Sequence, residues 1–331
     1  MMTTYPLARR TLLSCFGALM AAGALSAVGN ANAQSSTPLR VILPVSAGSG
    51  VDVIVRSSQV ALSKALGGQP VVIENLPGAG GITGTQTLIK AAPDGNTIAI
   101  ISNNHAVNPS VFKKLPYDSL ADITPISIIG GSPFVLVVNP KVPAKTAKEL
   151  QALLKSKPGE FNFGSSGNGT IIHLAGEMFM DEAGVKARHI PYKGTGPLIT
   201  DIMAGQVEMG VAAVAAVQGQ IKAGTLRPIG VMGKERVKSL PDVPTFAEQG
   251  LPGVDVAGWF AAIGPKGMPP EKVKQMHDAL VAAFNDPEVK AGFAKRDDAL
   301  ILSSPEDAAQ FLKSEQERYA RLVQKANVTL E

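Results

Sequence analysis

A regular alternation of short β-branched runs with amphipathic stretches constrains the fold of this chain more than any other feature. In the N-terminal part, apolar runs at residues 39–43, 71–73 and 97–101 are separated by two stretches of helical length, 51–66 and 82–91. Strands and helices in this order usually form a parallel sheet with helices packed on its faces. We therefore expect a doubly wound α/β sheet.

The same alternation continues along the rest of the chain. It resumes after a pair of predicted strands at 123–129 and 134–139, so we expect a second α/β unit with its own doubly wound sheet. The other predicted strands are 161–163, 187–190, 207–211, 227–231 and 299–302, and the other predicted helices are 147–155, 171–182, 197–204, 215–222, 270–284, 287–295 and 305–326.

The chain is expected to pass between the two units twice. Residues 254–263 are extended and would return the chain from the second unit to the first. We therefore predict two lobes joined by crossovers near Asn139 and Ala257. The predicted lobes are a discontinuous first lobe of residues 36–139 and 258–331, and a second lobe of residues 140–257.

The first 33 residues have the features of a cleavable export signal. Arg9 and Arg10 precede an apolar stretch at 11–29, and residues 31–33 read Ala-Asn-Ala, a small-residue cleavage site. We expect cleavage before Gln34 and a periplasmic location. The paired arginines also fit the twin-arginine route, so Sec and Tat export both stay open.

Composition excludes several classes of function. Cleavage would remove Cys15, the one cysteine of the chain, and with it any disulfide, zinc–thiolate site or cysteine nucleophile. The formal net charge of +4 comes from charges interspersed along the chain. Nucleic-acid binding usually needs a basic stripe with interleaved aromatic residues. We therefore expect no nucleic-acid partner.

A Gly/Ser-rich loop at 44–52 lies between the first predicted strand and the first predicted helix. Ligands of open α/β sheets bind outside the carboxyl ends of the strands. Backbone N–H groups and hydroxyls that converge there at a helix N-terminus favour an anion. The alternative is a flexible turn without a ligand. The candidate ligand contacts in this loop are Ser46, Ala47, Gly48, Ser49 and Asp52.

A second loop of the same kind, at 164–170, precedes the helix predicted at 171–182. Thr170 is also a good helix N-cap, which is the purely structural interpretation. Two helix N-termini that face one cleft would clamp a carboxylate through several charge-assisted hydrogen bonds. We expect His173, in the first helical turn, to form hydrogen bonds rather than act as a base. The candidate contacts here are Ser165, Ser166, Gly169, Thr170 and His173.

Patterns for cofactors, metals and catalysis are weak or missing. The run 78–84 imitates a dinucleotide fingerprint, but it follows the second predicted strand and no acidic residue ends the third, so we expect a tight turn that lines the cleft. The four histidines lack metal-site spacing, and 164–168 departs from G-x-S-x-G. We expect no cofactor, no metal and no catalytic residue. An enzyme would have Asp52, Glu74 or His105 as its candidate base.

Several longer motifs occur together in this chain. They are VIENLPGAGG at 72–81, NP at 108–109, LPYD at 115–118, SSGNGT at 165–170, HLAGE at 173–177, PYKGTGP at 191–197, LPDVPT at 240–245 and Trp259. In this order the chain resembles the tripartite tricarboxylate transporter substrate-binding proteins, also called the Bug family. The resemblance implies a two-lobed Venus-flytrap fold of the type II-like periplasmic binding proteins, with a small carboxylate held by the two helix-opening loops and delivered to a membrane transporter. We expect a monomer, and the further candidate ligand contacts are Gly81, Asn104, Lys193, Gly194, Thr195 and Ala212.

Two departures from the pattern of that family bear on the ligand. Residues 46–50 read Ser-Ala-Gly-Ser-Gly where the family usually has a Pro-Gly-Gly loop, and 211–213 read Val-Ala-Ala where it usually has Phe-Asp-Asn. If these positions face the ligand, the weaker polar grip on its far end favours a more apolar or aromatic carboxylate over a citrate-like one. Two other classes of function stay open: a secreted enzyme acting on a small carboxylic acid, and a ligand sensor without transport.

Overall fold

The computed structural model describes residues 37–326. The predicted signal peptide, residues 1–33, lies outside the described residues. Within the described range, no helix has both the length and the apolar character needed to cross a membrane.

The first group of strands forms a mixed sheet around β1 (Leu39–Leu43). β1 pairs in parallel with β2 (Val71–Asn75) on one side and with β3 (Thr97–Ser102) on the other, as the alternation predicts. β9 (Ala257–Pro265) then joins β3 in antiparallel orientation, and β4 (Ile123–Val138) joins β9. A parallel sheet is therefore extended by two long antiparallel strands.

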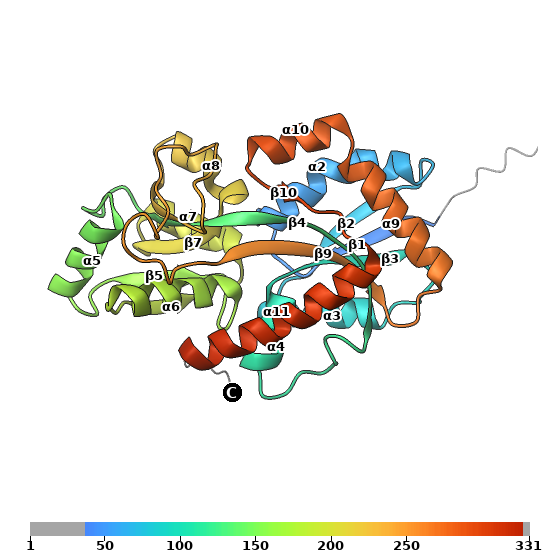
Figure 1. Ribbon diagram of the computed structural model, residues 1–331, viewed down its shortest axis with the longest axis horizontal. Coiled ribbons are helices and arrows are strands. Elements are labelled where there is room, and N and C mark those ends of the chain that lie inside the picture. The colour runs from blue at the N-terminus through green and yellow to red at the C-terminus, as the bar shows by residue number, and fades with distance from the viewer. Residues whose placement is uncertain (1–36, 327–331) are drawn as a thin grey trace, which may run out of the picture. The chain divides into compact units, whose positions relative to one another are not determined.

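Helices cover both faces of this first sheet (Figure 1). Buried Ile54, Val55 and Leu62 follow a helical period on α2 (Gly50–Ala65) and share an apolar cluster with β1 and α9 (Pro270–Phe284). The other elements of this half are η1 (Ala79–Gly81), α3 (Ile82–Ile89), α4 (Asn104–Val111), α10 (Pro287–Lys295), β10 (Ala299–Leu300) and α11 (Pro305–Ala326).

The second group of strands repeats this plan on a smaller scale. β5 (Asn162–Ser165) pairs in parallel with β6 (Arg188–Pro191) and with β7 (Met209–Ala213). The end of β4 pairs in antiparallel orientation with both β7 and β8 (Arg227–Met232). The helices of this half are α5 (Ala147–Ser156), α6 (Ile171–Ala183), α7 (Thr195–Ala204) and α8 (Val214–Lys222).

β4 belongs to both groups of strands. Residues 123–133 pair with β9, and residues 134–138 pair with β7 and β8. The prediction of two separate strands here is wrong, because Gly130 and Gly131 do not break the strand. A Cβ at Gly130 would collide with the carbonyl oxygen of Ala299, and one at Gly131 would lie 2.9 Å from that of Gly258. These glycines allow neighbouring backbones to approach closely.

Candidate ligand-binding site

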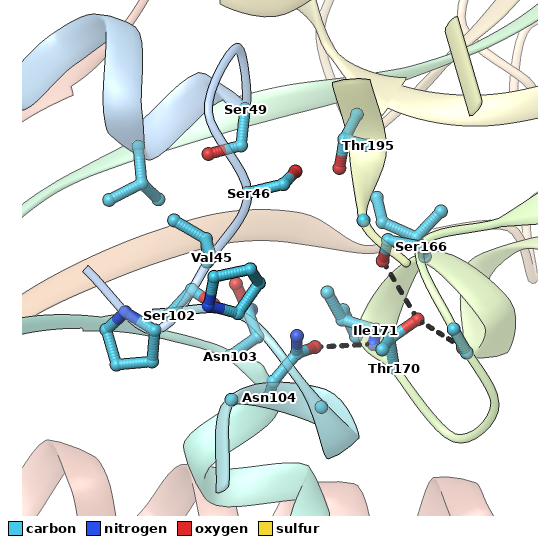
Figure 2. A pocket seen from close by; sticks show the side chains of 18 of the residues that line it. Val45, Ser46, Ser49, Ser102, Asn103, Asn104, Ser166, Thr170, Ile171 and Thr195 are labelled. Atoms are coloured by element: carbon cyan, nitrogen blue, oxygen red, sulfur yellow. Dashed lines mark hydrogen bonds between the residues drawn. The ribbon is translucent and has the colours of Figure 1, made fainter. Parts of the chain in front are cut away.

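The carboxyl ends of strands from both sheets open into one cavity of about 860 Å³. The loops that follow β1, β2 and β3 line it from the first half, and the loops that follow β5 and β6, together with Ala213 at the end of β7, line it from the second. Figure 2 shows hydroxyl and amide side chains from both halves around this space, among them Ser46, Ser49, Asn104, Ser166 and Thr195. The cavity thus lies where ligands of open α/β sheets bind.

The 44–52 loop is held in shape by its own aspartate. The Asp52 carboxylate accepts hydrogen bonds from the backbone N–H of Gly48 (2.9 Å), from the Arg56 Nε (2.8 Å) and from the Asn75 Nδ2 (3.0 Å). Ser49 caps α2, because its hydroxyl accepts from the Asp52 N–H at 3.3 Å. Asp52 is therefore turned into the loop and away from the cavity, and it supports the loop instead of lining the site.

From this first loop, Ser46 and Ser49 line the cavity, whereas Ala47, Gly48 and Asp52 do not. Ala47 and Gly48 are exposed instead.

The 164–170 loop is organised by hydroxyl groups. Thr170 caps α6: its Oγ1 accepts from the His173 N–H (3.3 Å) and donates to the carbonyl oxygen of Gly167 (2.8 Å). The Ser166 hydroxyl donates to the Thr170 Oγ1 at 3.0 Å, and both side chains line the cavity (Figure 2). The start of α6 therefore presents hydroxyls to the cavity as the sequence predicts.

The predicted contacts Ser165, Gly169 and His173 do not line the cavity. Each supports the loop from behind. The Ser165 hydroxyl donates to the Gly167 carbonyl oxygen (3.0 Å), and the Gly169 N–H donates to the Nδ1 of His173 (3.0 Å).

A pair of stacked histidines lies under this second loop. The rings of His173 and His189 are 3.7 Å apart between centroids and 7° from parallel. The His189 Nε2 lies 2.6 Å from the Ser165 hydroxyl, and the His173 Nε2 lies 3.5 Å from a Glu177 carboxylate oxygen. Burial, with a smaller effect from His173, lowers the pKa of His189 to about 4. His189 is therefore neutral at pH 7.

Ser165 and His189 form a serine–histidine pair that the sequence analysis did not foresee. The Ser165 residue is fully buried, however, and neither residue lines the cavity. A catalytic serine needs access to its substrate, and this hydroxyl is used inside the loop. The pair therefore serves to support the loop.

Of the remaining predicted contacts, five line the cavity and one does not. Gly81, Asn104, Lys193, Gly194 and Thr195 line the cavity. Lys193 is exposed, and it is the one charged side chain among the described lining residues. Ala212 does not line the cavity, while its neighbour Ala213 does.

The two halves touch around the cavity through small residues, which we call the rim contacts. A Cβ at Gly50 would lie 2.7 Å from the Ala213 Cβ, and one at Gly196 would lie 2.7 Å from the carbonyl oxygen of Ala47. Two hydrogen bonds accompany these contacts. The Ile171 N–H donates to the Asn104 Oδ1 (2.8 Å), and the Gly196 N–H donates to the Ser46 hydroxyl (3.4 Å).

Sequence reasoning missed most of the apolar wall of the cavity. The turn at 78–84 lines the cavity through residues 78–81, as expected. The missed lining residues with apolar side chains are Pro44, Val45, Val51, Ile54, Pro77, Phe112, Phe134, Ile171, Ile172, Pro191, Tyr192, Ala213, Trp259 and Phe260. The missed polar and glycine residues are Gly50, Ser102, Asn103, Ser132, Gly167, Asn168 and Gly258. The polar run 102–104 at the end of a predicted strand is a signal that would have found two of them.

Comparisons with known proteins agree with this geometry. A family model described as the tripartite tricarboxylate transporter family receptor matches residues 54–328. Protein BugT of Bordetella pertussis is 33% identical over 321 residues, which cover 96% of this chain and 98% of BugT.

Among solved structures, the periplasmic binding protein BugD is 29% identical with a TM-score of 0.86, covering 89% of this chain and 99% of its own. R. palustris Rpa4515, solved with adipate, is 28% identical with a TM-score of 0.85, covering 89% and 98%. MatC from Rhodopseudomonas palustris, solved with bound malate, is 26% identical with a TM-score of 0.82, covering 86% and 98%. These likenesses confirm the predicted two-lobed α/β fold of periplasmic binding proteins.

Proposed function

This chain belongs to the tripartite tricarboxylate transporter receptor family, and on that premise we propose that it is an extracytoplasmic solute-binding protein. It holds a small carboxylate in the cavity between two lobes and delivers it to the membrane subunits of a tripartite tricarboxylate-type transporter. Members of this family bind small carboxylates, and its solved relatives are binding proteins and not enzymes.

One observation carries the proposal: two long helices, α2 and α6, begin at the same cavity with hydroxyl N-caps. The positive ends of the two helices favour an anion, each by about 0.3–1 kcal/mol, or up to ~2 kcal/mol when partly buried. No aspartate or glutamate is found among the described residues that line the cavity. Hydroxyls, amides and backbone N–H groups therefore supply hydrogen bonds to a carboxylate without opposing its charge.

We place the first lobe at 36–139 and 258–331 and the second at 140–257. Support comes from β4, which exchanges β9 for β7 and β8 as pairing partners after residue 133, and from β9, which begins at Ala257. Bending at these two points would move one sheet relative to the other and open the cavity. The candidate contacts that line the cavity from the two lobes would then close on the ligand together.

We also propose export to the periplasm by removal of residues 1–33, and function there as a monomer. Proteins similar to this chain are periplasmic binding proteins. N-terminal sequencing of the mature protein should begin at Gln34. A sequence that begins upstream of Gln34 would contradict the proposed cleavage.

The function is tested with ligand released from the protein. Mass spectrometry of the purified protein after denaturation should identify a small carboxylate. The same compound at 100 times its dissociation constant should stabilise the refolded protein by roughly 2.7 kcal/mol in a thermal shift measurement. The matching amide loses the charge-assisted bonds and should bind far more weakly. Equal binding of acid and amide, or turnover of the compound, would contradict the proposal.

A further inference from the structure

The lining of the cavity combines polar and apolar groups. Hydroxyl and amide groups lie near the starts of α2, α4, α6 and α7, as Figure 2 shows for Ser49, Asn104, Thr170 and Thr195. Apolar side chains line several parts of the cavity. One group of them, Val51, Ile54, Phe134 and Ala213, comes from the start of α2, from β4 and from the end of β7.

Two pairs of residues make up this group: Val51 and Ile54 pack in the apolar cluster of α2, β1 and α9, whereas Phe134 and Ala213 pack in a second apolar cluster. Ala213 is paired with Phe134 across the sheet, and a Cβ at Gly50, next to Val51, would lie 2.7 Å from the Ala213 Cβ. The Phe134 ring covers Gly258, where a Cβ would lie 2.9 Å from its Cζ. Ile54 is fully buried and packs behind the surface that half-buried Val51, with the partly accessible Phe134 and Ala213, presents to the cavity.

This apolar surface offers little that could balance a second negative charge. The backbones of β4 and β9 are occupied by their pairing with each other, with Ser132 opposite Gly258. Ala213, the N-cap of α8, has no polar side chain, and the first-turn residues 214–216 of α8 do not line the cavity. The nearby buried Ser132 supplies a single hydroxyl, fewer donors than the starts of α2 and α6 offer to the first carboxylate.

We propose that the cavity selects carboxylates whose far end is uncharged and apolar, with Val51, Phe134 and Ala213 forming the subsite for that end and Ile54 packed behind it. This inference rests on the proposed function and names the ligand class within it. Burying an unpaired carboxylate against apolar walls costs several kcal/mol, whereas burying methylene groups or a ring is favourable. The cavity volume, equal to that of roughly thirty water molecules in the liquid, also leaves room for a ring.

The test compares acids that differ in their far end alone. Hexanoate and adipate form one matched pair, and benzoate and terephthalate form a second. Titration calorimetry on the mature protein should show each monoacid binding at least about 100-fold more tightly than its diacid, since the second carboxylate meets no cation in the subsite. Diacids that bind as tightly as the monoacids would overturn this inference and leave the proposed function standing.

A conservative variant locates the subsite. Val51→Thr keeps the shape of the side chain and adds a hydroxyl, so it should weaken hexanoate binding about 5- to 10-fold. Val60→Thr is the matched control, because Val60 lies on the same helix but is 82% exposed, and hexanoate affinity should not change. Equal effects of both variants would overturn the assignment of the subsite. If no acid of either pair binds, or if hexanamide binds as well as hexanoate, the proposed function fails together with this inference.

Discussion

Besides the contact of α11 with α6, the two halves of the molecule touch in two places that are built from different interactions. At the rim contacts, glycine backbones and the Ala213 methyl group meet at van der Waals distance, with Gly50, Gly194 and Gly196 allowing the approach. At the second place, which we call the 295–297 clasp, hydrogen bonds dominate. The Asp297 carboxylate accepts from the backbone N–H groups of Lys238 (2.9 Å) and Ser239 (2.6 Å), and the Gln218 Nε2 donates to the Lys295 carbonyl oxygen (2.9 Å).

The backbone of Asp297 distinguishes the clasp further. Its φ of 58° lies in the left-handed region, which non-glycine residues rarely adopt. Such a conformation persists where surrounding contacts hold it, and two charge-assisted hydrogen bonds do so here. The rim, in contrast, has two hydrogen bonds between the halves, one of them long at 3.4 Å.

This difference indicates which contacts between the halves depend on a bound ligand. Separating contacts between small residues costs little free energy, so the rim can open. A ligand that contacts both halves then supplies the attraction that holds the rim closed. The clasp supplies attraction of its own. Changes at the rim should therefore alter ligand binding strongly and stability weakly, and changes at the clasp should alter both moderately.

The largest effect is expected from a negative charge placed in the polar part of the cavity. Ser166→Asp adds a carboxylate beside the Thr170 hydroxyl and should weaken carboxylate binding about 100- to 1000-fold. Ser166→Asn, which is similar in size but neutral, is the control and should retain most of the affinity. Calorimetry with the released ligand measures both. Similar losses for the two variants would show that size, and not charge, matters at this position.

A side chain at the rim should have the next largest effect. Gly50→Val places carbon atoms where the Ala213 methyl group lies, so the halves cannot approach fully, and ligand affinity should fall roughly 30-fold. Gly219→Val is the control, because it is also helical and a Cβ there meets no atom within 4 Å.

X-ray scattering gives a second readout of the Gly50→Val variant. Wild-type protein and the Gly219→Val control should become more compact when ligand is added, and Gly50→Val should not. If Gly50→Val compacts like the wild type, close approach at the rim contacts is not needed for lobe closure.

At the clasp, Asp297→Asn should have a smaller effect on binding. Asparagine keeps the shape and tolerates a left-handed backbone, so the change removes charge alone. Hydrogen bonds to a charged group are each worth about 1.5–3 kcal/mol, and a neutral amide oxygen retains part of that. We expect ligand affinity to fall about 3- to 10-fold and the melting temperature to fall by about 2–4 °C per kcal/mol lost.

Asp278→Asn is the control for this variant, because Asp278 is exposed on α9 and pairs with Lys274 there. It should change neither ligand affinity nor melting temperature appreciably. If Asp297→Asn keeps full ligand affinity but has a lowered melting temperature, the clasp contributes to stability and not to ligand binding.

Most strands and helices of this fold can be predicted from the sequence, because each is a short segment with its own period and turn signals. α4 is an exception. It runs through Pro109, a residue that disfavours helix interiors, and the sequence analysis assigned no helix there. The predicted break in β4 is also wrong, because the glycines there permit close packing of neighbouring backbones and do not interrupt the strand.

The site could be predicted at the level of loops but not of single residues. Both Gly/Ser loops reach the cavity, yet Ala213 and Ser166 line it while Ala212 and Ser165 do not. Side chains alternate between the faces of a strand, so an error of one residue at a strand end selects the wrong face. Phe134 and Trp259 come from β4 and β9, whose pairing joins residues far apart in the sequence, and no local pattern indicates it.

Two histidines, buried His105 in the first half and half-buried His189 in the second, should have the smallest effect on ligand binding at pH 7. Burial, opposed by a hydrogen bond to the Ser119 carbonyl oxygen (2.7 Å), lowers the pKa of His105 on α4 to about 4. Burial also lowers the pKa of His189 under the 164–170 loop to about 4. As pH falls from about 6.5 to about 4, the unfolded chain takes up protons at both positions while the folded chain does not. These two sites therefore lower the free energy of unfolding over this window, and for buried His105 the loss at pH 5 is on the order of 2 kcal/mol.

The two histidines should differ in how they affect the ligand. Burial raises the pKa of Asp298, which acts in the opposite direction, but Asp298 is common to the wild-type protein and to both histidine variants. His105→Asn should flatten the slope of unfolding free energy against pH between 6.5 and 4 and leave the pH dependence of ligand affinity unchanged. His189→Asn should flatten both slopes, because protonation of His189 places a positive charge beside the Ser165 hydroxyl that shapes the loop. Denaturant melts at pH 7, 6 and 5 measure the slope of the unfolding free energy, and calorimetry at the same pH values measures the slope of ligand affinity. If the ligand affinity of the His189 variant varies with pH as in the wild type, the histidine pair supports the fold and not ligand binding.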